Sequence, residues 1–214
     1  MRLQNLNTVR PRKIAGLGYH DLPHVGNLEN DFFIAVGCSF TSGLALPYHH
    51  TWCHHLGEML GMEHLNLGFP GSSLEYQYRI IKNVRKIFPD KMVLWMHTYP
   101  LRSHREVLAP IIGDSLARIQ INQTWEDSES WHKIIKYVTL GSDEKVLMTN
   151  CWGYNNKIKF LIRNKICKKN LRYFLNDEEP VDTGSDNLHP GKDSHKCLAQ
   201  DWYKHITTHN IKVG

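Results

Sequence analysis

Two short segments near opposite ends of the chain carry side chains that together could hydrolyse an ester. Gly37–Gly43 places Ser39 directly after an apolar run, and Asp186–Pro190 places a carboxylate three residues before His189. A serine hydroxyl is a poor nucleophile without an adjacent base, and histidine suits that task because its pKa lies near neutral pH. The histidine in turn needs an acceptor that fixes its tautomer. We therefore predict a catalytic triad of Ser39 as nucleophile, His189 as general base and Asp186 as the orienting carboxylate.

A reaction of this kind also needs hydrogen-bond donors for the oxyanion of its tetrahedral intermediate. Backbone N–H groups at a turn or helix start are common donors, and the amide of Ser39 is one candidate. Gly71, in the turn 68–73, is a second, because glycine lets the backbone approach a ligand closely. We predict that both amides contribute to the oxyanion hole.

The apolar pattern indicates the elements that must position these residues. The run at 31–36 is short and nearly continuously apolar, which suits a strand buried on both faces, and further short strands are predicted at 64–67, 92–96 and 145–149. Helical spacing of apolar residues occurs at 51–61, 74–88, 131–140, 155–175 and 194–207. This alternation predicts an α/β fold with a three-layer, flavodoxin-like parallel sheet and helices on both faces.

The predicted domain covers residues 31–214, and residues 1–30 form an irregular N-terminal arm that packs on it. In a doubly wound sheet, ligands bind outside the carboxyl ends of the strands. The segments that follow the first three strands would all lie at that edge; they are 37–43, 68–73 and 97–102. The architecture therefore brings the serine turn and the glycine turn to the same edge of the sheet.

The motifs resemble those of the SGNH (GDSL-type) hydrolase superfamily, especially its short, divergent forms that start Gly-Cys-Ser-Phe-Thr. The family's first block, Gly-Asp-Ser-x-Thr-x-Gly, is matched by Gly37–Gly43, its oxyanion glycine by Gly71, and its Asp-x-x-His-Pro block by Asp186–Pro190. The resemblance spans roughly residues 31–206. It implies a serine esterase that acts through an acyl-enzyme without a metal or organic cofactor. Its substrates would be carboxylic esters, among them acetyl groups on carbohydrates, or lipid esters.

The chain departs from the family pattern at two positions. Cys38 stands where the family has an aspartate, which mainly orders the turn after the nucleophile. The third-block asparagine, an oxyanion donor, has no counterpart after the third strand. Thr98 is our candidate replacement; the alternatives are His97, Tyr99 and Asn150. Loss of one such donor costs about 2.7–4 kcal/mol in the transition state. The alternative hypothesis is therefore a weakly active or inactive SGNH-like domain that serves as a binding or assembly module.

Charge and composition limit the possible partners. The formal net charge is +5, and much of the excess lies between residues 157 and 172. This pattern predicts the solvated face of a surface helix, with a contact surface for a polyanion as the alternative. A nucleic-acid enzyme ranks last, because no acidic metal-binding cluster accompanies the basic residues. The expected partner is thus a small-molecule, carbohydrate or lipid ester, and the sequence gives no oligomeric state.

Cysteine usage and the N-terminal residues bear on location. Five scattered cysteines favour a reducing compartment over a disulfide framework. The basic first ten residues lack an apolar core behind them, and no apolar stretch is long enough to span a bilayer. We therefore expect a cytoplasmic protein without a secretory signal or a transmembrane segment.

Two further candidate sites lead to weaker hypotheses. The histidine-rich segment His49–His55 invites a zinc site, but its spacing matches no standard pattern, so we predict no metal there. Cys38 could act as nucleophile in place of Ser39. Its side chain, one residue earlier, would point away from the direction of the serine, which favours Ser39.

Overall fold

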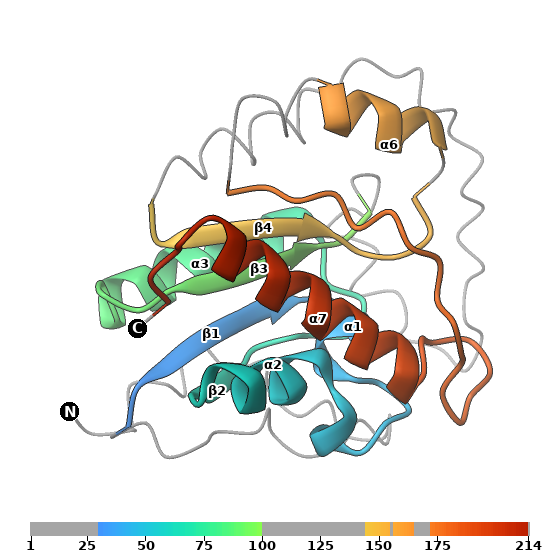
Figure 1. Cartoon of the computed structure of the whole chain (residues 1–214), viewed down its shortest axis with the longest axis horizontal. Helices are drawn as coiled ribbons and strands as arrows, with labels where there is room; N and C mark the ends of the chain where they lie inside the picture. Colours follow the sequence, from blue (N-terminus) through green and yellow to red (C-terminus); the bar gives the residue numbers. More distant parts are fainter. Residues whose placement is uncertain (1–29, 100–143, 155, 165–171, 214) are drawn as a thin grey trace.

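Four parallel strands form one sheet at the centre of the molecule (Figure 1). The computed structural model describes residues 30–99, 144–154, 156–164 and 172–213. Within them the strands are β1 (Phe32–Gly37), β2 (Glu63–Asn66), β3 (Val93–His97) and β4 (Val146–Asn150). Their order, β2-β1-β3-β4, is that of a flavodoxin-like sheet. The α/β fold class and all four predicted strands are confirmed.

The strand sequences explain why the sheet is buried on both faces. Every residue of β1, β3 and β4 is buried, as expected for strands covered by helices on both sides. The parallel register aligns Leu65, Ile34, Val93 and Val146 in one row across the four strands. This continuous apolar row supports β1, whose carboxyl end leads to Ser39.

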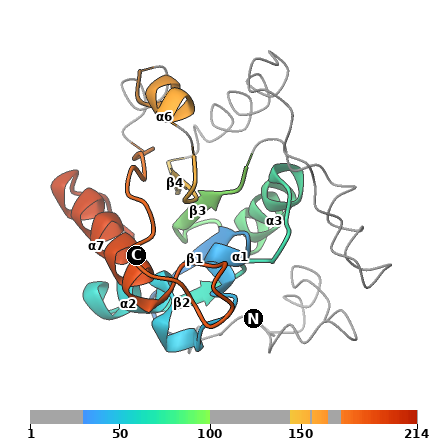
Figure 2. The same cartoon turned by 90° about the vertical axis from the view of Figure 1, so that its right-hand side faces the viewer.

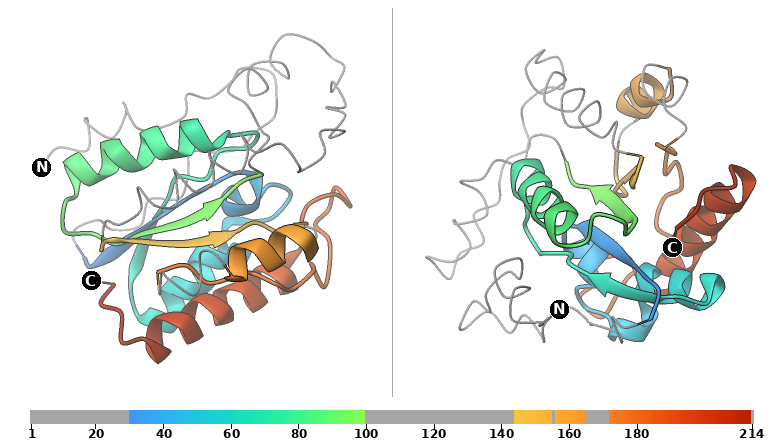
Figure 3. Two further views of the ribbon diagram at one scale, coloured as in Figure 1. Left: turned by 90° about the horizontal axis from the view of Figure 1, so that it is seen from above. Right: turned by 90° about the vertical axis from the view of Figure 1, so that its left-hand side faces the viewer.

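Helices cover the two faces of the sheet in separate layers (Figure 3). The face with α3 (Leu74–Ile87) lies opposite the face with α2 (Trp52–Leu60) and α7 (Lys192–Thr208). The last two helices pack on each other through the stacked rings of Trp52 and Trp202, whose centroids are 5.6 Å apart. The predicted helices at 51–61, 74–88 and 194–207 are thus confirmed. None of the described helices is long and apolar enough to cross a membrane.

The predicted helix at 155–175 is wrong at 172–175. Helix α6 (Asn156–Ile162) is short, and the chain is extended by Tyr173, which forms a parallel bridge with Met148 of β4. Backbone bonds to Met148 and a bond from the Thr149 hydroxyl to Phe174 hold this segment against the sheet. These long-range hydrogen bonds outweigh the local helical pattern. The predicted arm at 1–30 and helix at 131–140 lie outside the described residues, except for residue 30.

Candidate active site

Ser39 lies at the carboxyl end of β1, where the chain turns sharply into a single helical turn, α1 (Ser39–Ser42). Cys38 caps this turn, and its carbonyl accepts the amide of Ser42 at 3.0 Å. The turn is tight because Gly37 has no side chain. A Cβ there would lie 2.0 Å from the Thr41 hydroxyl oxygen and 2.8 Å from the carbonyl of Met96. The predicted nucleophile therefore directly follows β1, an interior strand of the sheet.

His189 and Asp186 form a hydrogen-bonded pair within one hairpin. The Nδ1 atom of His189 lies 2.6 Å from Asp186 Oδ2, and the amides of Leu188 and His189 both donate to Asp186 Oδ1 at 3.0 Å. Partial burial by itself would raise the pKa of Asp186. The two amides and the His189 ring outweigh it and lower the pKa to about 2. The carboxylate thus stays ionised and binds Nδ1, which leaves Nε2 for another partner.

The hairpin packs against the segment that contains Ser39. Figure 2 shows the loop before α7 lying beside α1 at the carboxyl edge of the sheet. The rings of Phe40 and His189 meet edge to face, with centroids 5.6 Å apart. The Ser185 hydroxyl donates to the carbonyl of Ala45 at 3.1 Å, just beyond α1. His189 therefore lies next to the residue that follows Ser39.

Asp182 closes the base of this hairpin and starts α7. Its carboxylate accepts the amides of Asp193 and Ser194 and the hydroxyl of Ser194, at 3.1, 2.8 and 2.6 Å. Partial burial acts to raise its pKa, but these donors prevail and lower it. Thr183 and Pro190 pair across the base. We did not predict this cap, because the residues it joins are too far apart in sequence for a local capping pattern.

Gly71 lies in a turn that is bonded to the end of β1. Its φ of +74° is a left-handed conformation that favours glycine. On either side of it, the Phe69 amide and the Ser72 hydroxyl donate to the carbonyl of Gly37, at 2.9 and 3.1 Å. The structure thus brings the predicted oxyanion glycine to the same strand end that leads to Ser39.

Thr98 is fully buried at the end of β3. Its amide donates to Gln77 Oε1 at 3.3 Å, and its carbonyl accepts the hydroxyl of Tyr154 at 2.9 Å. The prediction that Thr98 contributes to the oxyanion hole therefore concerns its hydroxyl. It remains a prediction.

The three alternative donors have structural hydrogen bonds. Burial lowers the pKa of His97 to about 4, and its ring lies 2.5 Å from the Tyr173 hydroxyl. The hydroxyl of Tyr99 donates to the carbonyl of Trp152 at 2.7 Å. The amide of Asn150 donates to the carbonyl of Asn176 at 2.9 Å. Thr98 has structural hydrogen bonds as well, so the choice among these donors stays a prediction.

Two aromatic residues that we did not predict lie behind the site. The Trp152 ring contacts Phe40 at 5.8 Å and the ring of His195 at 5.5 Å. His195 is buried, and its Nδ1 accepts the backbone amide of Trp52 at the start of α2. Burial lowers the pKa of His195 to about 3, so the ring is neutral with its proton on Nε2. A hydrogen bond between two helices so far apart in sequence cannot be predicted from a local motif.

The histidine-rich segment forms a chain of ring contacts on η2 (Tyr48–His50) and α2. The rings of His49 and His50 are 4.2 Å apart, and His54 and His55 both face Glu58. Among the described residues, no group of three or more His, Cys, Asp or Glu side chains is placed to hold a metal.

Part of the basic segment is used inside the molecule. Lys159 is buried and donates to the carbonyl of Asp177 at 2.9 Å and to Glu179 at 3.2 Å. Arg163 pairs with the carboxylate of Asp177. Lys159 thus anchors α6 to residues 177–179 and is not part of a solvated face, whereas the pair of Arg163 lies at the surface.

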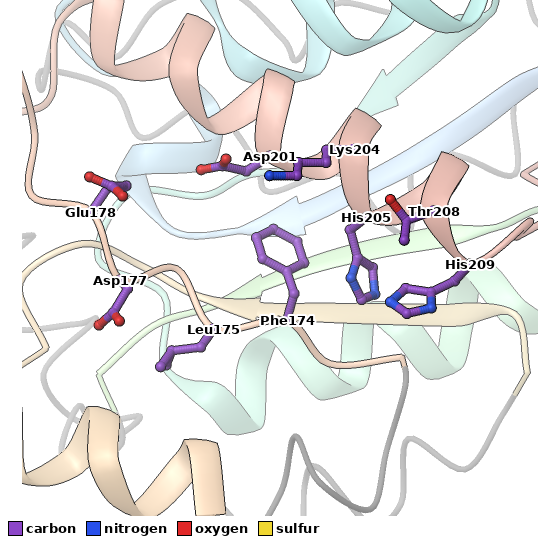
Figure 4. A pocket seen from close by; sticks show the side chains of 9 residues that line it. All are labelled: Phe174, Leu175, Asp177, Glu178, Asp201, Lys204, His205, Thr208 and His209. Carbon is purple, nitrogen blue, oxygen red and sulfur yellow. The ribbon is translucent and has the colours of Figure 1, made fainter.

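A hollow of about 290 Å³ lies between the second half of α7 and residues 174–178. Figure 4 shows Phe174 beside His205 in this hollow, with Asp201 on the same helix. Burial raises the pKa of the Asp201 carboxyl. The hollow is lined by none of the predicted site residues, so it is separate from the candidate active site.

Comparisons with known proteins identify relatives by fold alone. No protein-family model matches the chain, and no curated protein matches it. Among solved structures, a lipolytic protein of the G-D-S-L family from Desulfitobacterium hafniense DCB-2 is similar at a TM-score of 0.54 and 15% identity. The match covers 82% of this chain and 99% of that one.

Two similar structures are carbohydrate esterases. A family 2 enzyme from Corynascus thermopiles, with a carbohydrate-binding domain, matches at a TM-score of 0.59 and 10% identity, over 89% of this chain and 69% of that one. A two-domain esterase active on acetylated mannans matches at 0.51 and 14% identity, over 86% of this chain and 50% of that one.

Proposed function

We propose that this chain, which has the fold of the SGNH (GDSL-type) hydrolases, is a serine-dependent ester hydrolase. One observation carries the proposal. The Asp186–His189 pair, joined at 2.6 Å, lies on a hairpin that is packed through Phe40 against the turn with Ser39. These are the nucleophile, base and orienting acid that acyl transfer requires.

In the proposed reaction Ser39 Oγ attacks the ester carbonyl carbon while His189 Nε2 takes its proton. The amides of Ser39 and Gly71, with the hydroxyl of Thr98, donate to the oxyanion. The intermediate collapses, the ester C–O bond breaks, and the alcohol leaves with the proton from His189. Water then attacks the acyl-enzyme while His189 takes its proton; the bond between Ser39 Oγ and the acyl carbon breaks, His189 returns the proton to Ser39 Oγ, and the carboxylic acid is released. Asp186 stays ionised throughout.

The substrate class is a carboxylic ester or an O-acetyl ester of a carbohydrate, with lipid esters as a related possibility. Support comes from the two carbohydrate esterases and the G-D-S-L lipolytic protein that share the fold. The reaction needs no metal or organic cofactor, because the attacking group, the base and the oxyanion donors all come from the chain.

The second candidate function is a binding or assembly module that has little or no catalysis. It is favoured by the third-block segment, where His97 and Tyr99 are bound to other residues and the amide of Thr98 donates to Gln77. Such a protein would keep the fold but stabilise the oxyanion poorly.

Labelling with an alkyl fluorophosphonate tests the proposal, because this probe reports an activated serine without knowledge of the substrate. We expect an adduct on Ser39 in the wild type, mapped by peptide mass spectrometry, and none in Ser39→Ala or His189→Ala. Circular dichroism must show that both variants are folded. A folded wild type that takes up no label would exclude the hydrolase and favour the module.

A further inference from the structure

We infer that Gln77, a buried residue of α3, is a positioning residue for the oxyanion hole. The inference rests on the proposed function, since it assigns a role within the same site. Gln77 is 1% exposed, yet it carries a polar amide into the core. Buried amides are kept in folded proteins when their hydrogen bonds are satisfied.

The Gln77 side chain joins three strand exits. Its Nε2 donates to the Ser72 hydroxyl at 2.8 Å, and its Oε1 accepts the indole N–H of Trp95 at 2.8 Å and the amide of Thr98 at 3.3 Å. The Ser72 hydroxyl in turn donates to the carbonyl of Gly37 at 3.1 Å. One amide thus connects the end of β1, the turn after β2 and the end of β3.

Three residues of this hydrogen-bond network are predicted oxyanion donors or lie close to one in the sequence. Ser72 follows Gly71 directly, Gly37 lies two residues before Ser39, and Thr98 is itself the third candidate. An oxyanion hole is effective only when its donors are held in place before the reaction. Gln77 is placed to fix all three relative to one another, although it touches neither the substrate nor the nucleophile.

The direction of the hydrogen bonds explains why a glutamine is needed. The Trp95 indole can only donate and the carbonyl of Gly37 can only accept. Gln77 must therefore present its oxygen to Trp95 and its NH₂ to Ser72, and Ser72 passes its own hydrogen to Gly37. A glutamate would keep the acceptor for Trp95 and Thr98 but would offer no hydrogen to Ser72.

Two variants interrupt this series of hydrogen bonds at different points. In Gln77→Glu the single hydroxyl hydrogen of Ser72 can go to the new carboxylate or to the Gly37 carbonyl, so one of the two bonds is lost. Ser72→Ala loses the bond to the Gly37 carbonyl with a smaller change in the core. We expect both to lower kcat and the fluorophosphonate labelling rate of Ser39 by roughly tenfold to a hundredfold, because misplaced oxyanion donors act mainly on the transition state. KM and the shape of the pH–rate profile should stay unchanged, since His189 and Asp186 are untouched.

A matched control removes a buried amide that does not reach the oxyanion segments. The side-chain amide of Asn176 is buried and donates to the carbonyl of Asn150, the last residue of β4, at 3.4 Å. Asn176→Asp should lower the melting temperature while kcat stays within about twofold of the wild type, because its hydrogen bonds are structural. If Asn176→Asp lowers kcat as strongly as Gln77→Glu at equal loss of stability, Gln77 has only a structural role.

Amide hydrogen exchange gives a readout that does not require activity. Peptides covering 69–73 should exchange faster in Gln77→Glu and Ser72→Ala, and those covering the His189 hairpin should not. If Gln77→Glu does not fold, Ser72→Ala decides. If the wild type is labelled and the folded variants keep its labelling rate and its exchange at 69–73, the role of Gln77 is overturned. If the wild type is not labelled but the variants exchange faster at 69–73, the proposed function is overturned instead.

Discussion

At the scale of single residues, the Asp186 carboxylate is the group whose chemistry the structure defines best. Asp186→Asn keeps the size of the side chain but can offer N–H to Nδ1 of His189, which favours the wrong tautomer. We expect the labelling rate of Ser39 to fall by about three to four orders of magnitude. This rate is measured by quenching the labelling reaction at successive times and quantifying the Ser39 adduct by mass spectrometry.

The pH dependence of the wild-type labelling rate tests the ionisation state of Asp186. Because the pKa of Asp186 is about 2, its ionisation cannot shape the wild-type profile near neutral pH. A wild-type rate that follows the titration of a carboxyl near pH 5 would contradict this assignment of the hydrogen bonds.

Single residues also show where sequence reasoning succeeds and where it stops. Asp186 and His189 are three positions apart, so their pairing could be predicted from a local motif. Gln77 could not, because its partners Ser72, Trp95 and Thr98 come together only when α3 packs on the sheet. Its polar side chain on the apolar face of a predicted helix was the available signal.

At the scale of elements, the proposed mechanism depends on the contact that holds the His189 hairpin against the segment just after α1. Ser185→Ala removes the bond to the Ala45 carbonyl and frees one side of the hairpin. We expect a loss of stability of about 0.5–1.5 kcal/mol, and a labelling rate of Ser39 reduced by roughly twofold to tenfold, because His189 is then less well oriented.

The matched control for this experiment is Thr207→Ala on α7. It removes a comparable exposed hydrogen bond, from the Thr207 hydroxyl to the carbonyl of Tyr203, far from the hairpin. Equal labelling rates in the two variants would mean that the Ser185 bond does not position His189. Ser185→Thr, which keeps a hydroxyl, should restore the rate.

The elements differ in how far they could be predicted. Strands β1, β3 and β4 could be predicted because apolar runs buried on both faces leave a clear pattern. The conformation of 172–175 could not, since this segment is predicted to be helical but Tyr173 pairs with Met148 of β4. Tertiary hydrogen bonds decided between two conformations that the local sequence allows.

At the scale of the whole molecule, two buried neutral histidines make stability depend on pH. Burial lowers the pKa of His97 from 6.5 to about 4 and that of His195 from 6.5 to about 3. Below pH 6.5 the unfolded chain binds protons that the folded protein does not. Their contribution is therefore complete above pH 6.5 and is lost as the pH falls toward 4 and 3.

Thermal melting between pH 7.5 and 4 measures this effect. Each histidine contributes on the order of 3 kcal/mol across the window, so the melting temperature should fall steadily as the solution is acidified. His195→Asn should flatten the curve, because an amide oxygen can still accept the Trp52 N–H but does not titrate. A melting temperature that rises from pH 7 to 5 would refute the burial of these rings as neutral groups.

The crowding around Gly37 also has a consequence for how this protein can diverge over time. A Cβ at Gly37 would meet the backbone of β3 as well as Thr41, and β3 cannot move aside because it is paired with β1 on one edge and β4 on the other. Leu188, next to His189, is 80% exposed. Substitutions should therefore accumulate beside His189 more freely than at Gly37. Among related sequences, the glycine two residues before the serine should vary least.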